Sequence, residues 1–206
     1  MDAKIKNLAG RDRMTRIADL VFEAGMLRRT PRTGYQFLGT GQENVAEHSF
    51  RTALIGWVLA KLSGADAART LLMCLFHDLH EARTGDFNYV NSMYDGCEDT
   101  EALRHALWGT GLEDEVLGLW TELERTESPE ARLAQDADQL DFIANLKEQL
   151  DLGNRYAGQW LDASVQRLRT EVGRELAEVI RRTDHKDWWF LGPDPRWWAT
   201  KDGGKI

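Results

Sequence analysis

Apolar residues recur every three or four positions along most of this chain, and this spacing is typical of helices with one buried face. No segment alternates apolar and polar residues for long enough to predict a strand. The pattern therefore predicts an all-α fold, a bundle of about six to eight helices. The predicted helices span 11–28, 44–63, 65–83, 101–108, 113–124, 128–150 and a long last segment that includes both Val165 and Val179.

Two of these helices begin with specific capping residues. Asn44 precedes Glu47 by three positions, the arrangement of a capping box, in which each side chain binds the backbone N–H of the other residue. The segment Ser128-Pro129-Glu130 places a hydroxyl cap before a proline in the first helical turn. Both signals predict where a helix starts.

The third predicted helix carries the most unusual stretch of the chain. Its apolar run 71–76 ends in an adjacent histidine and aspartate, His77 and Asp78, and Glu81 and Asp86 follow shortly after. We expect this helix to bury Ala68, Leu72, Leu75 and Leu79. Burying an imidazole and a carboxylate at the end of such a run costs several kcal/mol unless each has a partner. One divalent cation would satisfy both groups.

Length and charge limit the classes of function. The chain has 206 residues, of which 26 are basic and 34 acidic, so its net charge is −8 and its pI is near 5.2. A chain with this balance is not expected to bind a nucleic acid polymer or an anionic membrane. The length suits one compact domain over 1–206.

The cysteines and the hydropathy pattern predict the compartment. Cys74 and Cys97 lack the spacing of a zinc site, and we expect both to be free thiols in a reducing environment. No apolar stretch reaches the roughly 18 residues of a membrane span, and no signal-peptide pattern occurs. We therefore expect a cytoplasmic protein that does not associate with membranes.

Four residues from separate predicted elements are candidates for one metal site: His48, His77, Asp78 and Asp138. Two imidazoles and two carboxylates suit Mn, Co, Fe or Zn, with Mg as a further candidate, and leave positions for water and substrate. Taken singly, each has another interpretation. A lone His48 on an apolar face is more often a hydrogen-bonded core histidine, and Asp138 beside Asp136 and Asp141 would normally belong to a solvated acidic face.

Three segments together resemble the HD-domain metal-dependent phosphohydrolases, whose ligands follow the order H, HD, D along an all-helical core. The segments are 43–49, 77–86 and 136–140. The amino-acid sequences of these segments are most similar to those of the 5′-deoxynucleotidases, which remove phosphate from deoxynucleoside 5′-monophosphates. The resemblance spans about 27–150, so a C-terminal helix and a Trp-rich tail over 160–206 would complete the HD-type domain.

The resemblance implies that His48, His77, Asp78 and Asp138 bind the metal. It also implies that Glu81 and Asp86 are the two acidic residues of the nucleotidase motif. Glu81 lies one helical turn from Asp78 and is expected to face the same site, so we assign it acid–base catalysis. We assign Asp86 to the sugar hydroxyl of the substrate or to positioning water.

Two further residues are candidates for binding the substrate. Arg32 is expected to pair with the phosphate through its planar guanidinium. Tyr35 stands where the family has a tryptophan that crowds the 2′ position of the sugar. The alternatives are a solvated loop arginine and a tyrosine packed at the edge of the core.

Two other functions stay open. A related HD-type enzyme would remove triphosphate or pyrophosphate from a nucleotide. A non-catalytic HD scaffold would bind partners through the tail 188–198, which holds four of the eight tryptophans. We expect this tail to dock on the body of the protein or on a second subunit, and the resemblance implies a homodimer.

Overall fold

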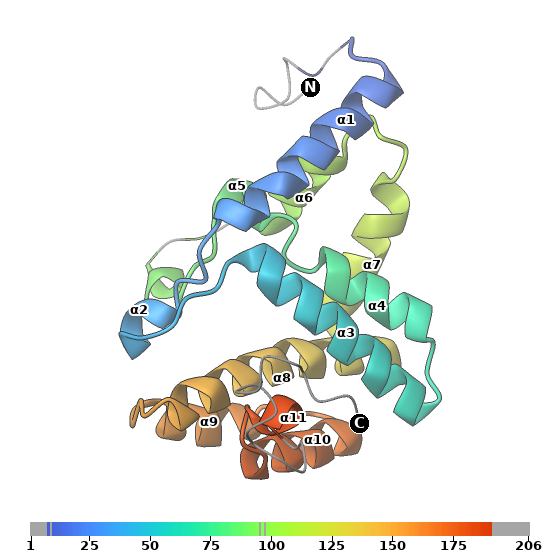
Figure 1. Ribbon diagram of the computed structural model, residues 1–206. Coiled ribbons are helices and arrows are strands. Elements are labelled where there is room, and N and C mark those ends of the chain that lie inside the picture. Colours follow the sequence, from blue (N-terminus) through green and yellow to red (C-terminus); the bar gives the residue numbers. More distant parts are fainter. Residues whose placement is uncertain (1–7, 9, 95, 97, 191–206) are drawn as a thin grey trace, which may run out of the picture.

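The computed structural model describes residues 8, 10–94, 96 and 98–190 (Figure 1). Its helices are α1 (Arg13–Ala24), α2 (Tyr35–Leu38), α3 (Val45–Ser63), α4 (Ala67–Phe76), α5 (Glu81–Thr84), α6 (Asp99–Leu107), α7 (Glu113–Arg125), α8 (Pro129–Asp151), α9 (Ala157–Val165), α10 (Glu171–Arg182) and α11 (Asp187–Phe190), with short 3₁₀ turns at Gly25–Arg29 and Asn91–Met93. Eight of these described helices have nine residues or more. The prediction of an all-α bundle of six to eight helices is confirmed.

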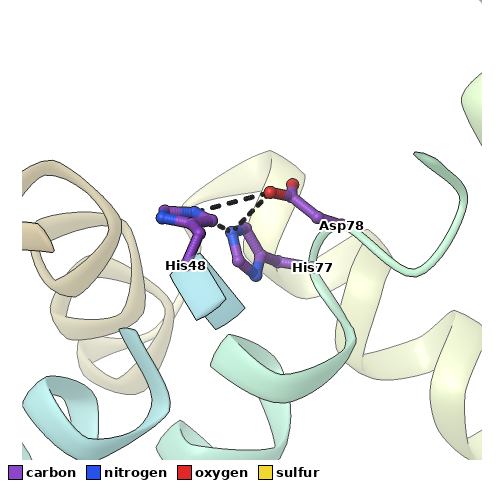
Figure 2. Close-up of side chains that lie close together, drawn as sticks. All are labelled: His48, His77 and Asp78. Atoms are coloured by element: carbon purple, nitrogen blue, oxygen red, sulfur yellow. Dashed lines mark hydrogen bonds and ion pairs between the residues drawn. The ribbon is translucent and has the colours of Figure 1, made fainter. Parts of the chain in front are cut away.

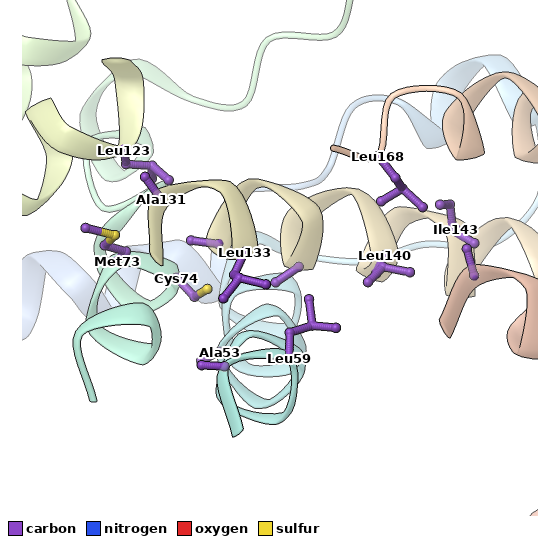
Figure 3. Close-up of a cluster of buried hydrophobic side chains, with 14 of the residues drawn as sticks. Ala53, Leu59, Met73, Cys74, Leu123, Ala131, Leu133, Leu140, Ile143 and Leu168 are labelled. Carbon is purple, nitrogen blue, oxygen red and sulfur yellow. The ribbon is translucent and has the colours of Figure 1, made fainter. Parts of the chain in front are cut away.

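Helix α8 lies at the centre of the fold. It contacts α3, α4, α7, α9 and α10, and Figure 1 shows it between the α3–α4 pair and the α9–α10 pair. Leu133, Leu140 and Ile143 of α8 belong to one buried apolar cluster with Leu59 of α3 and Met73 of α4, and Figure 3 shows Ile143 beside Leu168. Each of these large side chains contributes roughly 1.5–3 kcal/mol through its burial, so this packing fixes the positions of α3, α4 and α8 relative to one another.

The two predicted helix caps are confirmed. The side chain of Asn44 accepts a hydrogen bond from the Glu47 backbone N–H, and Glu47 accepts one from the Asn44 backbone N–H. The Ser128 hydroxyl accepts the Ala131 N–H at 3.0 Å, with Pro129 in the first turn of α8. The capping box fixes the start of α3, and therefore the place of His48 within its first turn.

The buried face of α4 differs from the prediction. Helix α4 buries Ala67, Thr70, Met73 and Cys74, whereas Ala68 and Leu75 are exposed. The run 71–76 is apolar on all sides, so its pattern fits several faces equally well. Packing against the neighbouring helix α3 selects the buried face of α4. Cys74 lies so close to Gly56 of α3 that a Cβ added at Gly56 would lie only 2.5 Å from Cys74 Sγ. Leu79, in the turn after α4, is buried as predicted.

The prediction of one long last helix is wrong, because a loop separates α9 from α10. Both oxygens of the buried Asp136 accept hydrogen bonds at this break, from the backbone N–H groups of Arg169 and Thr170 at 2.8 Å each. The Thr170 hydroxyl then accepts the Gly173 N–H and caps α10. These bonds hold the loop 166–170 against α8.

Some expectations lie outside the described residues. Cys97 and most of the Trp-rich tail lie outside these residues, so the expected docking of the tail stays a prediction. Cys74 is a buried free thiol, as predicted. Among the helices that the structure describes, none combines the length and the apolar character that crossing a membrane requires.

Candidate functional site

Three helices and one turn bring the predicted metal ligands together. His48 lies in the first turn of α3 and is fully buried, while His77 ends α4 and Asp78 follows it in the turn before α5. Figure 2 shows these three side chains turned toward one another. The two Nε2 atoms are 3.1 Å apart, and Asp78 Oδ2 is 3.1 Å from His77 Nε2 and 3.5 Å from His48 Nε2.

Asp138, from the middle of α8, completes the cluster. Its Oδ1 lies 3.2 Å from His48 Nε2 and 4.0 Å from His77 Nε2. The structure therefore brings together all four residues that the sequence singled out as ligands. Two ring nitrogens that face each other beside two carboxylates form a donor set of two nitrogen and two oxygen ligands, which suits a divalent transition metal. These residues fit such an ion.

The charges within the cluster are strongly coupled. Burial lowers the pKa of His48, but its hydrogen bonds to Asp138 and Asp141 outweigh burial and raise the pKa to about 10. Burial raises the pKa of Asp138, but the hydrogen bond and charge of His48 bring it down to about 2. A metal binds only the neutral imidazole, so it has to displace the proton that His48 holds.

One residue behind the cluster was missed as a functional residue in the sequence. Asp141 of α8 is fully buried, and its Oδ2 accepts a hydrogen bond from His48 Nδ1 at 2.6 Å. Arg51 of α3 forms an ion pair with the other oxygen, and Asn145 donates to Asp141 at 3.2 Å. The hydrogen bond to Asp141 makes Nδ1 of His48 the donor and leaves Nε2 of His48 free for a metal.

The spacing of the acidic residues along α8 could have indicated from the sequence that Asp141 belongs to the site. Asp141 lies one helical turn after Asp138, on the side of the helix that faces His48, but the sequence suggested a solvated acidic face. The helix is in fact covered on several sides, so Asp136 and Asp141 are both buried. Each is held by hydrogen bonds instead of by solvent.

Glu81 begins α5 beside Asp78 and is almost completely buried. Burial and the nearby carboxylates of Asp78 and Asp86 raise the pKa of Glu81 to about 9. Its Oε2 atom has no hydrogen-bond partner among the described residues. Glu81 is therefore a neutral carboxylic acid near pH 7, with a proton to give.

The loop 30–34 brings Arg32 to the site. Arg32 Nη1 lies 2.8 Å from Asp86 Oδ1 and 3.3 Å from Asp78 Oδ2. The other oxygen of Asp86 accepts the backbone N–H of Thr33 at 2.6 Å and its hydroxyl at 2.7 Å. Arg32 is thus a mostly buried site residue, and both Asp86 oxygens hold the loop that carries it.

Two cavities flank the cluster. The aromatic cavity, of about 550 Å³, has on its walls Arg32, Tyr35, Phe37, Asp86, Phe87, Tyr89, Asp138, Phe142 and Trp160. The polar cavity, of about 770 Å³, is bounded by His77, Asp78, His80, Asp99, Trp120, Glu124, Asp138 and Arg169. Tyr35 lines the aromatic cavity and also packs against the main core, so it has both of the positions considered for it.

The chain matches the model of a known protein family. A family model described as HD domain matches residues 24–180. The matched range contains the four clustered residues, Glu81, Asp86 and the loop that carries Arg32.

Curated proteins with similar sequences share one description. The chain is 31% identical over 147 residues to 5′-deoxynucleotidase HDDC2 from Danio rerio, covering 68% of this chain and 72% of that protein. It is 28% identical over 137 residues to 5′-deoxynucleotidase HDDC2 from Homo sapiens, covering 64% of this chain and 67% of that protein.

Solved structures show the same fold. A conserved hypothetical protein from Pyrococcus furiosus matches with a TM-score of 0.68 and 30% identity, covering 81% of this chain and 99% of that one. A protein from Pyrococcus horikoshii matches with a TM-score of 0.66 and 26% identity, covering 80% of this chain and 98% of that one.

Proposed function

This chain belongs to the HD domain family, and on that premise we propose that it is a metal-dependent phosphohydrolase that releases phosphate from deoxynucleoside 5′-monophosphates. The observation that carries the proposal is the meeting of His48, His77, Asp78 and Asp138 beside a neutral acid and a buried arginine. The names of the similar curated proteins support the substrate class.

The proposed metal ligands are His48, His77, Asp78 and Asp138. The donor set favours Mn, Co, Fe or Zn, and Mg remains a candidate. When bound, the ion would polarise a phosphoryl oxygen and lower the pKa of a water molecule toward about 7. Asp141 holds the His48 ring through Nδ1, so His48 Nε2 would be available to the ion.

Arg32 is the proposed phosphate-binding residue. Its guanidinium lies within ion-pair distance of Asp78, so a phosphate bound at the cluster would be within its reach. Asp86 contributes by fixing the loop 30–34, and in this way it positions Arg32. This role adds to the contact with the sugar or with water that the sequence suggested, because each Asp86 oxygen can accept more than one hydrogen bond.

Glu81 is the proposed general acid. Hydrolysis breaks the bond between phosphorus and the 5′-oxygen, and the departing oxygen needs a proton. Glu81 holds that proton near neutral pH, because burial and two neighbouring carboxylates oppose its ionisation. The attacking water leaves its hydroxyl on phosphorus, and the proton that this water releases restores the neutral form of Glu81.

The aromatic cavity is the proposed nucleoside site. Its volume is in the range of small-molecule sites, and its aromatic walls suit a planar base. Tyr35 stands in this wall near Arg32, where it would meet the sugar of a nucleotide whose phosphate lies at the cluster.

We also propose a domain organisation, an oligomeric state and a cellular location for this chain. A single HD-type domain over 1–206 is supported by the match over 24–180. A homodimer is supported by exposed large apolar side chains such as Phe22 on α1 and Phe50 on α3. A cytoplasmic location is supported by the free thiol of Cys74.

The test is a substrate panel with chelator-treated protein to which Mn or Co has been restored. We expect orthophosphate from dAMP, dGMP and TMP, and none without metal. Release of triphosphate or pyrophosphate from a nucleotide would favour the related HD-type activity instead. Release of orthophosphate that persists in His77→Ala and Asp78→Ala variants would refute the proposed site.

A further inference from the structure

The aromatic cavity and the polar cavity share one boundary. Among the described residues, three line both cavities: Asp138, Gln139 and Arg167. Asp138 belongs to the proposed metal ligands, so the phosphate of a substrate has to lie at this boundary. Arg167 is the cation of the three. It therefore borders the place where phosphate and nucleoside join.

The charges of the site leave room for such a cation. Asp78, Asp86 and Asp138 face one guanidinium, that of Arg32, which already pairs with two of them. Three carboxylates and one arginine together carry a net of two negative charges. A bound divalent ion would therefore bring the net charge of the site to zero and no higher. A nucleoside monophosphate is close to a dianion at neutral pH, and a site without net positive charge would bind it weakly.

Arg167 is available for this task. Its side chain forms no hydrogen bond or ion pair with any residue of the described chain, whereas Arg32 and Arg51 are both paired. Its backbone is nevertheless fixed, because its N–H bonds to Ser164 and the following residues 169 and 170 are tied to Asp136. The structure thus holds an unpaired guanidinium on a fixed loop at the cavity boundary.

We propose that Arg167 is a second phosphate-binding residue, which reaches the substrate phosphate from the loop between α9 and α10. This inference rests on the proposed function. The planar guanidinium of Arg167 can donate two parallel hydrogen bonds to phosphate oxygens, which a lysine cannot do.

The test compares Arg167→Gln and Arg167→Lys with the matched control Arg169→Gln. Arg169 lies two residues further along the same loop, is also exposed, and borders the polar cavity alone. We expect Arg167→Gln to raise KM for dAMP roughly 10-fold, the size of one charge-assisted hydrogen bond, with kcat nearly unchanged. Arg167→Lys should recover part of the loss, and Arg169→Gln should match the wild type.

Equilibrium binding supplies a second readout that needs no turnover. Calorimetric titration of the metal-loaded proteins with orthophosphate should show the same roughly 10-fold weakening in Arg167→Gln alone. Unchanged phosphate binding in this variant, or an equal loss in Arg169→Gln, would overturn the proposal. If the wild type hydrolyses no deoxynucleoside monophosphate, the proposed function fails, and the phosphate titration still decides the role of Arg167.

Discussion

Replacing Asp141 with asparagine removes one charge behind the proposed metal site and keeps the shape of the side chain. Asp141 is fully buried, accepts a hydrogen bond from His48 Nδ1 at 2.6 Å, and pairs with Arg51. It belongs to no ligand set proposed for the metal. Its effect on metal binding must therefore pass through the His48 ring.

The structure sets the size of the expected effect. In Asp141→Asn, a neutral oxygen takes the place of the carboxylate, so the imidazole becomes a weaker base and its ring is held less firmly. Changes at residues that orient metal-binding histidines lower metal affinity by about 10- to 100-fold. This corresponds to about 1.4–2.7 kcal/mol of binding free energy. Arg51 keeps a partner in Glu148 at 2.7 Å, so the fold itself should lose less.

The assay is competition between the protein and a chelator for Mn or Zn, followed at equilibrium. Asp151→Asn is the control, because Asp151 lies on the same helix, roughly 15 Å away, and pairs with Lys147 and His185. We expect weaker metal binding in Asp141→Asn and no change in the control. Equal metal affinity in wild type and Asp141→Asn would refute the role of Asp141 in holding His48.

Two predictions concern Glu81. Glu81→Gln should lower kcat by at least about 100-fold while metal binding is retained, because the amide cannot protonate the leaving oxygen; a variant with wild-type kcat would exclude Glu81 as the acid. In metal-stripped protein, the pKa of Glu81 rises on folding from its usual 4.5 to about 9, so the folded state binds more protons than the unfolded state between these values. Stability should therefore fall as pH rises from 5 to 9, by at most about 1.4 kcal/mol per pH unit for this group. Urea unfolding in chelator should show a shallower fall in Glu81→Gln, and identical slopes in both proteins would contradict the raised pKa.

Local signals in the sequence predicted the parts of this site that depend on one element. The cap at Asn44 fixed the start of α3, and the end of the apolar run at His77 and Asp78 marked the turn after α4. The cap at Ser128 placed Asp138 on a helix, whereas its role as a ligand came from the resemblance to the HD-domain phosphohydrolases. These signals involve residues close together in the chain, so a pattern can contain them.

Features that depend on contacts between distant segments were not predictable in the same way. The run 71–76 fits several faces, and the fit of Gly56 against Cys74 selects the buried one. The break before α10 depends on Asp136, more than thirty residues earlier in the chain. Likewise, no local pattern shows that Asp141 meets His48, because that contact exists only once α3 and α8 have packed.

Anomalous diffraction from crystals soaked in Mn or Co would locate the metal that this site is proposed to bind. We expect one strong peak that His48 Nε2, His77 Nε2, Asp78 and Asp138 all approach to within about 2.0–2.3 Å. The same soak of a His77→Ala crystal should lose this peak. A peak at another group of residues, or none beside these four in a metal-dependent active enzyme, would show that these four residues do not form the metal site.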